Sequence, residues 1–251
     1  MMISERHQRI LEYLTADPEI TVRELAKRLC VSEPTVRRDF TELHRRGFIT
    51  KIYGGAILNR PAADGEIPFT VRENEKSSVK SEIGAKAAKL VSDGMVVMLD
   101  GSTSAYHLVP YLAKKKDLLV VTSGAKTAVA LAEANIHTFS TGGQMITNSF
   151  SYVGESAESF VRKFNADILF FSCHGLSESG QMTERIIEEA NLRRVMFSSC
   201  KKKILLCDSS KFGRNCFYNM GDVREIDGII SEAELPAAIA EIMNDKTETK
   251  K

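Results

Sequence analysis

Hydrophobic positions near the start of the chain recur with the spacing of a short amphipathic helix. Val36, Phe40 and Leu43 follow one another at i, i+4 and i+7, which predicts a helix with a narrow buried stripe. The Ser32 side chain can cap its N-terminus by accepting a hydrogen bond from a backbone N–H, and Gly47 is placed to end it. Polar side chains, two arginines among them, fall on the opposite face.

A second short helix is predicted directly before this one. Thr21 and Glu24 have the spacing of a capping box. The apolar positions that follow share one helical face: Val22, Leu25, Ala26 and Leu29. Only residues 30–32 separate the two helices, as in a helix-turn-helix. Arginines on a helix are most often a solvated face, but this tight pair of capped helices favours a helix that reads the major groove of DNA.

The segment after Gly47 alternates β-branched and aromatic residues with polar ones as far as Gly54-Gly55, which predicts a two-stranded wing. We expect the polar helix face and the wing to bind double-stranded operator DNA, with Arg38 contacting a base and Arg37 a phosphate. The candidate DNA-binding residues are Ser32, Pro34, Thr35, Arg37, Arg38, Thr41, Arg45, Lys51 and Tyr53.

Farther along, apolar runs alternate with helical patterns. Runs that are apolar on both faces and separated by helices indicate an α/β fold with a mostly parallel sheet covered on each side. The expected strands are Met95–Leu99, Leu118–Thr122, His137–Ser140, Asp167–Ser172, Lys203–Cys207 and Gly228–Ile230. Periodicity lapses from residue 59 to residue 80. We therefore expect a winged helix-turn-helix domain at 1–58, a linker at 59–80 with a short helical end, and an α/β effector and oligomerisation domain at 81–245.

Composition adds little to this picture. The net charge is +1, but residues 1–60 hold 11 Lys and Arg against 8 Asp and Glu, a mildly basic balance consistent with phosphate contact. The five cysteines show no CxxC spacing, which indicates reduced thiols and no metal site. Neither a signal peptide nor an apolar run long enough to cross a membrane is evident, so we expect a cytoplasmic protein with no membrane contact.

Polar and glycine-rich segments follow the predicted strands, where ligands of open parallel sheets collect. Free amides, hydroxyls and a lysine around one cleft suit a small phosphorylated metabolite. The candidate effector-binding residues are Asp100, Gly101, Ser102, Thr103, Ser104, Thr122, Ser123, Gly142, Gly143, His174 and Lys211. No segment matches a dinucleotide fingerprint or a Walker loop, so no cofactor is expected.

Each of these candidates has a structural alternative. Residues 100–104 would equally form a plain capped turn between a strand and a helix. A lone His174 at a strand end is more often a hydrogen-bonded structural residue. Lys211 would equally pair with Asp208 and hold its own loop.

The chain resembles the deoxyribonucleoside-repressor (DeoR) family of bacterial transcription regulators over essentially its full length. The resemblance rests on VRELAKRLCVSEPTVRRDFTELHRRGFITKIYGGA in the head, and on LDGSTS, STGG, VGE, TERIIEEANLRRVM and CDSSKFG beyond it. It implies an effector domain similar to the phosphosugar isomerase fold. Three positions depart from the family pattern: Ser123 replaces an asparagine, Arg193 a lysine, and His174 stands where relatives vary.

The resemblance implies a regulator of sugar metabolism, usually a repressor, that a phosphosugar releases from its operator. It is not expected to be an enzyme. The alternative is an active sugar-phosphate isomerase with an appended DNA-binding head. Isomerisation needs a carboxylate base, and the acids in or next to the candidate loops are Asp100, Glu188, Glu189 and Asp208, none paired in the sequence with a second acid–base group. We also expect a homodimer or homotetramer, because one head makes too few base contacts for tight binding.

Overall fold

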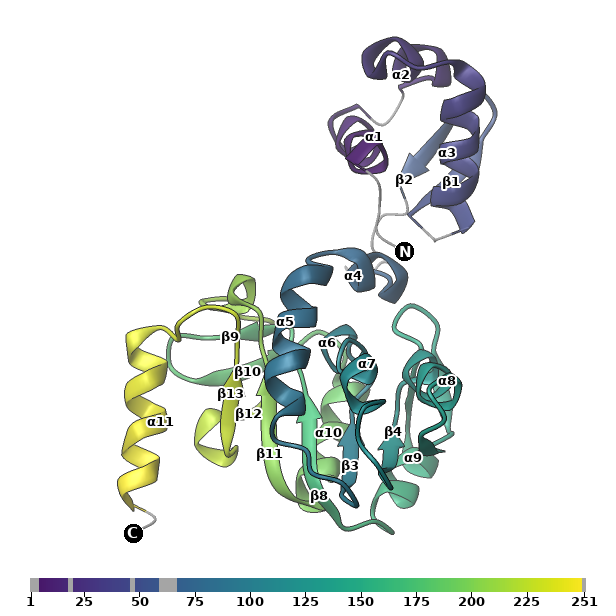
Figure 1. Cartoon of the computed structure of the whole chain (residues 1–251). Helices are drawn as coiled ribbons and strands as arrows, with labels where there is room; N and C mark the ends of the chain where they lie inside the picture. Colours follow the sequence, from purple (N-terminus) through teal and green to yellow (C-terminus); the bar gives the residue numbers. More distant parts are fainter. Residues whose placement is uncertain (1–4, 18–19, 46–47, 59–66, 250–251) are drawn as a thin grey trace. The chain divides into compact units, whose positions relative to one another are not determined.

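A computed structural model describes residues 5–17, 20–45, 48–58 and 67–249 of the chain. The chain divides into two compact units, residues 1–75 and residues 76–251, shown in Figure 1. Each unit has its own hydrophobic core, and we describe them separately.

Within the N-terminal unit, residues 5–58 form a three-helix head with a wing. Its helices are α1 (Glu5–Ala16), α2 (Val22–Leu29) and α3 (Glu33–Arg45), and the antiparallel strands β1 (Ile49–Ile52) and β2 (Gly55–Leu58) follow. Gly54 turns the wing with φ of +81°, a left-handed conformation that favours glycine. Fully buried Leu25, Val36 and Leu43 join α2 to α3 in the core. The predicted helices and wing are therefore confirmed.

The segment assigned to a linker is more ordered than expected. Helix α4 (Phe69–Asn74) lies within it, and α5 (Ser77–Ala88) begins four residues before the expected start of the effector domain. Phe69 is buried, with 1% of its surface exposed. The boundary at residue 80 remains a prediction, but the second half of the expected linker is helical.

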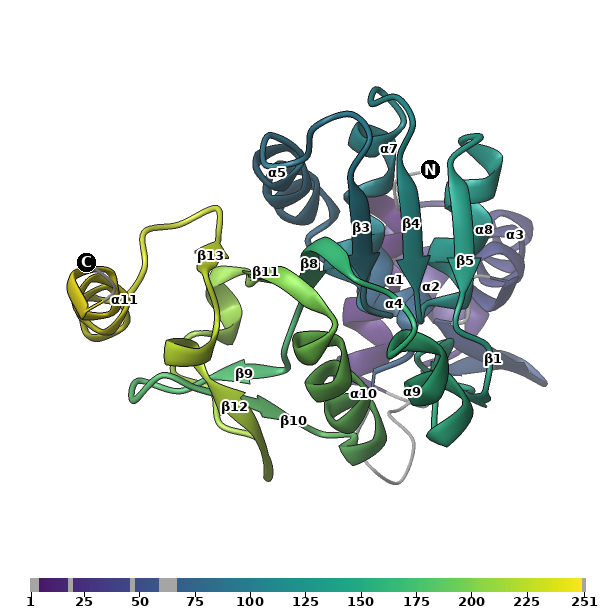
Figure 2. The ribbon, with the colours of Figure 1, turned by 90° about the horizontal axis from the view of Figure 1, so that it is seen from below.

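The second unit is built on a six-stranded parallel sheet in the order β13-β11-β8-β3-β4-β5, and Figure 2 shows β3, β4 and β5 of this sheet side by side. The strands lie close to the six expected ranges: β3 (Val96–Leu99), β4 (Leu119–Thr122), β5 (His137–Ser140), β8 (Ala166–Phe171), β11 (Cys200–Leu206) and β13 (Gly228–Ile230). Successive residues of one strand enter different cores. Met98 packs into the core that contains α9 and α10 residues, whereas Val97 and Leu99 pack with residues of α5 and α7. The sheet is thus covered on both faces, as predicted.

Helices supply these two layers. Those packed on one side are α5, α6 (Thr103–Tyr106), α7 (Val109–Leu112) and α8 (Ala125–Glu133), and on the other side α9 (Glu155–Val161) and α10 (Ile187–Ser198). The last described element is α11 (Ala237–Thr249). None of the helices in the described part of the chain is long and apolar enough to cross a bilayer.

Short antiparallel strands complete the second unit, and the sequence did not predict them. A hairpin of β6 (Gln144–Ile146) and β7 (Ser151–Val153) lies between β5 and α9. A small sheet in the order β12-β10-β9 combines β9 (Gly175–Leu176), β10 (Gln181–Glu184) and β12 (Tyr218–Asp222). These short segments lack the apolar runs by which the strands of the parallel sheet were predicted.

Candidate DNA-reading surface and effector site

Local hydrogen bonds fix the helix-turn-helix. Thr21 and Glu24 form the predicted capping box, which orders the start of α2. Cys30, in a left-handed conformation with φ of +53°, closes α2 by donating its N–H to backbone carbonyls. Ser32 accepts the N–H of Thr35 at 3.4 Å, so it caps α3 as predicted.

One face of α3 is open to solvent. Pro34, Arg37, Arg38 and Thr41 are exposed, while Val36 and Phe40 on the other side are buried. Arg37 Nη2 lies 3.6 Å from Glu33 Oε2, a weak surface pair that a DNA phosphate can replace. Within the described residues Arg38 has no side-chain partner, which leaves its five N–H donors available. The side chain of Arg45 lies outside the described residues.

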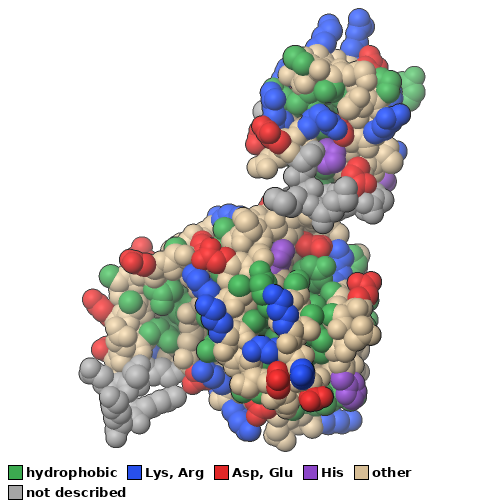
Figure 3. All heavy atoms as spheres, in the orientation of Figure 1, with side chains coloured by type: hydrophobic (Ala, Val, Ile, Leu, Met, Phe, Trp, Pro, Cys, Tyr) green, Lys and Arg blue, Asp and Glu red, His purple; other side chains and the backbone are tan. Residues whose placement is uncertain are grey.

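The wing adds two further candidates. Tyr53 is fully exposed at its tip, and Lys51 is exposed on β1. Lys51 Nζ donates to Thr41 Oγ1 at 3.3 Å, and Thr41 Oγ1 donates to the Arg37 carbonyl at 2.9 Å, so the wing and the exposed face of α3 form one surface. Lys and Arg side chains project from this unit in Figure 3.

The sequence analysis missed the contact that holds α3 against α1. Asp39 is buried, and its carboxylate accepts two hydrogen bonds from Arg6 and lies 3.0 Å from Nε2 of His7. Burial opposes ionisation of this carboxyl, but Arg6 and His7 hold the pKa of Asp39 below its ordinary value. The contact spans 33 residues and has no local sequence signal.

The loop after β3 is held by its own aspartate. Asp100 is buried, and its Oδ1 accepts the N–H of Ser102 at 3.0 Å. Its Oδ2 accepts the N–H of Ser172 at 3.0 Å and Nε of Arg193 at 2.8 Å. With both oxygens hydrogen-bonded, the Asp100 carboxylate holds the loop that follows β3 against the end of β8.

The following residues form the capped turn that was the structural alternative. Ser102 Oγ accepts the N–H of Ala105 at 3.1 Å, which caps α6. Thr103 and Ser104 are buried in its first turn. Ser104 Oγ is buried and has no hydrogen-bond partner among the described residues.

The β6–β7 hairpin packs directly on this turn. A Cβ atom on Gly101 would lie 1.9 Å from Ser151 Oγ, so only glycine fits there. Tyr152 N donates to the Ser123 carbonyl at 2.7 Å, and Thr122 Oγ1 accepts the N–H of Gly124 at 3.1 Å. These contacts bring the candidates Gly101, Thr122 and Ser123 together beneath the hairpin.

The backbone conformation at residues 142 and 143 requires glycine. Both have left-handed φ values, +62° and +106°, in the turn that leads into β6. A Cβ atom on Gly143 would also approach the Val153 carbonyl to 2.7 Å. The structure therefore accounts for both through turn geometry.

Lys211 reaches back to the central strands. Its Nζ donates to Ser172 Oγ at 2.7 Å and lies 3.7 Å from Asp208 Oδ2. The Asp208–Lys211 pair that was the structural alternative is thus present, but the shorter contact is the one to Ser172. Because Ser172 N donates to Asp100, Lys211 and the loop after β3 lie at the same edge of the sheet.

Beneath these loops lies a buried charge cluster that the sequence analysis missed. The Arg193 side chain is 5% exposed and bonds three carboxylates, on Asp100, Glu184 and Glu189, at 2.7 to 3.1 Å. His174 Nδ1 lies 2.5 Å from the other Glu184 oxygen. Burial opposes ionisation of Glu184, but Arg193 and His174 hold its pKa below the ordinary value. The sequence analysis did not include Glu184 among the acids near the candidate loops, so it missed the contact between Glu184 and His174.

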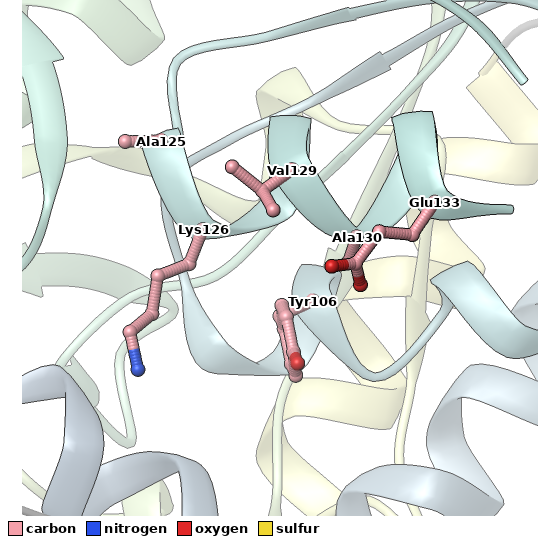
Figure 4. A pocket seen from close by; sticks show the side chains of 6 residues that line it. All are labelled: Tyr106, Ala125, Lys126, Val129, Ala130 and Glu133. Carbon is pink, nitrogen blue, oxygen red and sulfur yellow. The ribbon is translucent and has the colours of Figure 1, made fainter.

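Two pockets differ in position and size. Gly101, Ser123, Ser151 and Glu189 help to line a cavity of about 10 Å³, close to the least space that holds a water molecule. Oε1 of Glu189 has no hydrogen-bond partner among the described residues. A larger pocket of about 290 Å³ lies between α6 and α8, with the six lining side chains drawn in Figure 4. It is mainly apolar, and none of the candidate effector residues lines it. Within the described residues there is no cluster of His, Cys, Asp or Glu that could hold a metal ion.

Two family models match this chain. The DeoR-like helix-turn-helix domain matches residues 6–62, and the DeoR C terminal sensor domain matches residues 75–233. The protein belongs to the DeoR family. The predicted family and the predicted α/β fold behind a helix-turn-helix head are both confirmed.

Relatives of this DeoR-family chain are regulators over nearly its whole length. It is 31% identical to the uncharacterized HTH-type transcriptional regulator YulB of Bacillus subtilis (strain 168), over 98% of this chain and 95% of YulB. It is 26% identical to the glycerol-3-phosphate regulon repressor of Escherichia coli (strain K12), over 98% of this chain and 97% of the repressor. These relatives support a DNA-binding transcriptional regulator over an isomerase. Among solved structures, ribose 5-phosphate isomerase A of Methanocaldococcus jannaschii is similar with a TM-score of 0.41 and 15% identity, over 54% of each chain.

Proposed function

We propose that this protein represses a sugar-metabolism operon by binding double-stranded operator DNA, and that a small phosphorylated sugar releases it. The observation that carries the DNA-binding half is the exposed face of α3, where Arg38 stands without a side-chain partner among the described residues. A short helix with a buried stripe on one side and free guanidinium donors on the other suits the major groove, where arginine pairs with guanine.

The effector half is supported by the edge of the sheet. Lys211 lies there beside Ser172, and Ser102 to Ser104 start a helix next to it. Hydroxyls, amides and an ammonium group are the donors that a phosphate group accepts from. The candidate effector residues, Asp100 to Ser104, Thr122, Ser123, Gly142, Gly143, His174 and Lys211, remain our proposal for this site.

The experiment selects operator sequences from random DNA with the full-length protein and then titrates the selected duplex at fixed salt. Sugar phosphates and the corresponding unphosphorylated sugars are added in turn. We expect sequence-specific binding that only a phosphorylated sugar weakens. Binding without sequence preference, or equal release by sugars that lack the phosphate, would contradict the proposal.

We further propose that the protein acts in the cytoplasm as a homodimer or homotetramer, assembled through its second unit. A single small head contacts few base pairs, so two heads on repeated half-sites are needed for tight binding. Light scattering at working concentration should give at least twice the mass of the 27.8 kDa chain. A monomer both with and without DNA would contradict this.

The isomerase alternative gains one observation from the structure, the contact between His174 and Glu184. A general base must reach the proton of its substrate. The side chain of Glu184 has no exposed surface and is bonded to Arg193. A substrate therefore has no access to this carboxylate, whose role is to neutralise the buried arginine. We therefore propose that the protein is not an enzyme. Turnover of a pentose or hexose phosphate that Glu184→Gln abolishes would favour the isomerase.

A further inference from the structure

One oxygen of the buried Glu189 carboxylate has no hydrogen-bond partner among the described residues. Glu189 lies in the first turn of α10, and only 5% of its surface is exposed. Its Oε2 accepts a hydrogen bond from Nη2 of Arg193 at 3.1 Å, and Oε1 is the oxygen left over. Burying a carboxylate oxygen without a donor costs free energy, so such atoms are normally paired. A donor group is therefore expected beside Oε1.

Glu189 lines the small cavity beneath the β6–β7 hairpin. Gly101, Ser123 and Ser151, all buried, line it too. Helix α10 contacts both β7 and α9, and Figure 2 shows α10 beside α9. The cavity volume of about 10 Å³ is close to the least that holds a water molecule, so it admits one oxygen atom and not a whole sugar ring. A ligand in the neighbouring loops can place a single hydroxyl group there.

Neutralising Arg193 does not account for Glu189. Arg193 bonds Asp100 at 2.8 Å and Glu184 at 2.7 Å, whereas its contact with Glu189 is longer, at 3.1 Å. The arginine thus has two closer counter-ions, and its contact with Glu189 uses only one of the two oxygens. The other oxygen requires a separate partner.

This cavity adjoins the proposed effector loops, since two of its lining residues are candidates for effector binding. Arg193, which also lines it, donates to Asp100 Oδ2, and the same oxygen accepts the N–H of Ser172. Ser172 Oγ in turn accepts a hydrogen bond from Lys211. A continuous series of contacts therefore runs from Lys211, a positively charged donor, to Glu189, an acceptor. A ligand with a phosphate at one end and hydroxyl groups at the other matches this order.

We propose that Glu189 binds a hydroxyl group of the phosphorylated effector and so helps to determine which sugar is recognised. This inference rests on the proposed phosphosugar control. An ionised carboxylate accepts hydrogen bonds and donates none, so Oε1 favours a hydroxyl group and repels a phosphate. The phosphate then lies toward Lys211, and the hydroxyl-bearing end of the sugar lies toward α10. The proposal adds α10 to an effector site that otherwise consists of the loops after the parallel strands.

The test measures binding of ribose 5-phosphate, glucose 6-phosphate and glycerol 3-phosphate to the full-length protein by calorimetry, at constant ionic strength. Propyl phosphate, which carries a phosphate but no hydroxyl group, is the comparison. Glu189→Gln keeps one oxygen for Arg193 and replaces the other with an amide donor. It should weaken binding of each sugar phosphate that the wild type binds by about tenfold or more, as expected for a hydrogen bond to a charged group, and leave binding of propyl phosphate unchanged. Glu188→Gln is the matched control, because Glu188 is the exposed neighbour on the same helix.

The outcomes separate this inference from the proposed function. A loss confined to the hydroxyl-bearing probes, with Glu188→Gln like the wild type, supports the inference. If Glu189→Gln binds the sugar phosphates normally, Oε1 meets water only; if it loses propyl phosphate equally, Glu189 acts through Arg193. Either result overturns the inference and leaves phosphosugar control standing.

A second variant covers the case in which Glu189→Gln does not fold. Glu189→Asp keeps the charge but withdraws the carboxylate from the cavity by one methylene group, so it should show the same selective loss. Equal affinity of folded Glu189→Asp and the wild type for the sugar phosphates would overturn the inference. If no sugar phosphate binds the wild type, both the inference and the proposed phosphosugar control are overturned.

Discussion

Arg6 and Asp39 form a two-point ion pair that ties the first helix of the head to the third. Arg6 Nε donates to Oδ2 at 2.6 Å and Nη2 donates to Oδ1 at 2.8 Å. Asp39 directly follows Arg38 on α3, so the pair fixes the orientation of the helix that presents Arg38 to solvent. A parallel, bidentate geometry of this kind specifies direction as well as distance.

Asp39→Asn should destabilise the head by about 1.5–3 kcal/mol, the range for hydrogen bonds to charged groups. Calorimetry of the full chain should show a lower midpoint for the transition that this variant affects. Glu158→Gln removes an exposed pair with Arg162 in the other unit and should leave that transition unchanged.

The same pair sets a pH dependence. Because the folded-state pKa of Asp39 is lowered, its stabilisation is fully present above the unfolded value of about 3.9 and is lost as the pH falls through the folded value. The stability difference between wild type and Asp39→Asn should therefore shrink below pH 4. A difference that stays constant from pH 7 to pH 3 would show that charge is not its source.

Arg38→Ala should weaken specific operator binding by about 1–3 kcal/mol and relax the preference at one base pair. The head should remain folded, because Arg38 is exposed and bonds no other described side chain. Arg37→Ala should instead weaken binding to all sequences alike and reduce its salt dependence. A gel-shift titration at fixed salt, with Arg162→Ala as the control, compares them. Unchanged affinity and preference in Arg38→Ala would exclude a base contact.

The sequence revealed the parts of this fold that depend on neighbours along the chain. Capping at Thr21 and Ser32, the turn at Gly54 and the apolar run of β3 each depend on a few neighbouring residues, so their patterns are visible in the sequence. The same holds for the loops after the parallel strands, because strand direction alone places them at one edge.

Contacts between distant residues left no such pattern. Arg193 meets Asp100 across 93 positions, and Lys76 meets Asp208 across 132. Of the three carboxylates around Arg193, Glu189 lies four residues away on α10, but Glu184 and Asp100 lie outside this helical spacing, and each acid alone resembles a surface residue. The contact of Lys76 was missed for a related reason: a charged stretch next to an irregular one resembles a linker, and the sequence analysis assigned Lys76 to one.

Arg193→Met should destabilise the second unit strongly, by about 3–5 kcal/mol, because it leaves carboxylates buried without their counter-ion. Arg194→Met is the matched control, because Arg194 is exposed and pairs with Glu225 at the surface, where an ion pair contributes little to stability. Denaturant unfolding of both variants measures the difference. Equal stability of the two would show that water or protonation compensates the carboxylates in the folded state.

Lys211→Ala should lower the affinity for a phosphorylated effector by about 1.5–3 kcal/mol, since it removes a charged donor next to Ser172. DNA affinity without effector should change little, because the head is untouched. In a reporter strain the variant should repress normally and fail to induce. Lys201→Ala, which removes an exposed pair with Asp167, is the control and should induce like the wild type.

If Lys211→Ala loses stability but keeps its effector affinity, the structure explains why. Lys211 donates to Ser172, and Ser172 Oγ donates to the Leu206 carbonyl, so the lysine also joins the ends of β8 and β11. If Lys211→Ala unfolds at a much lower temperature while its folded fraction still binds effector normally, the lysine holds the sheet edge and does not bind phosphate. Lys211→Arg separates the two roles because it keeps the positive charge. It should restore effector affinity if the charge binds the phosphate, and should restore only stability if the contact with Ser172 is what the lysine supplies.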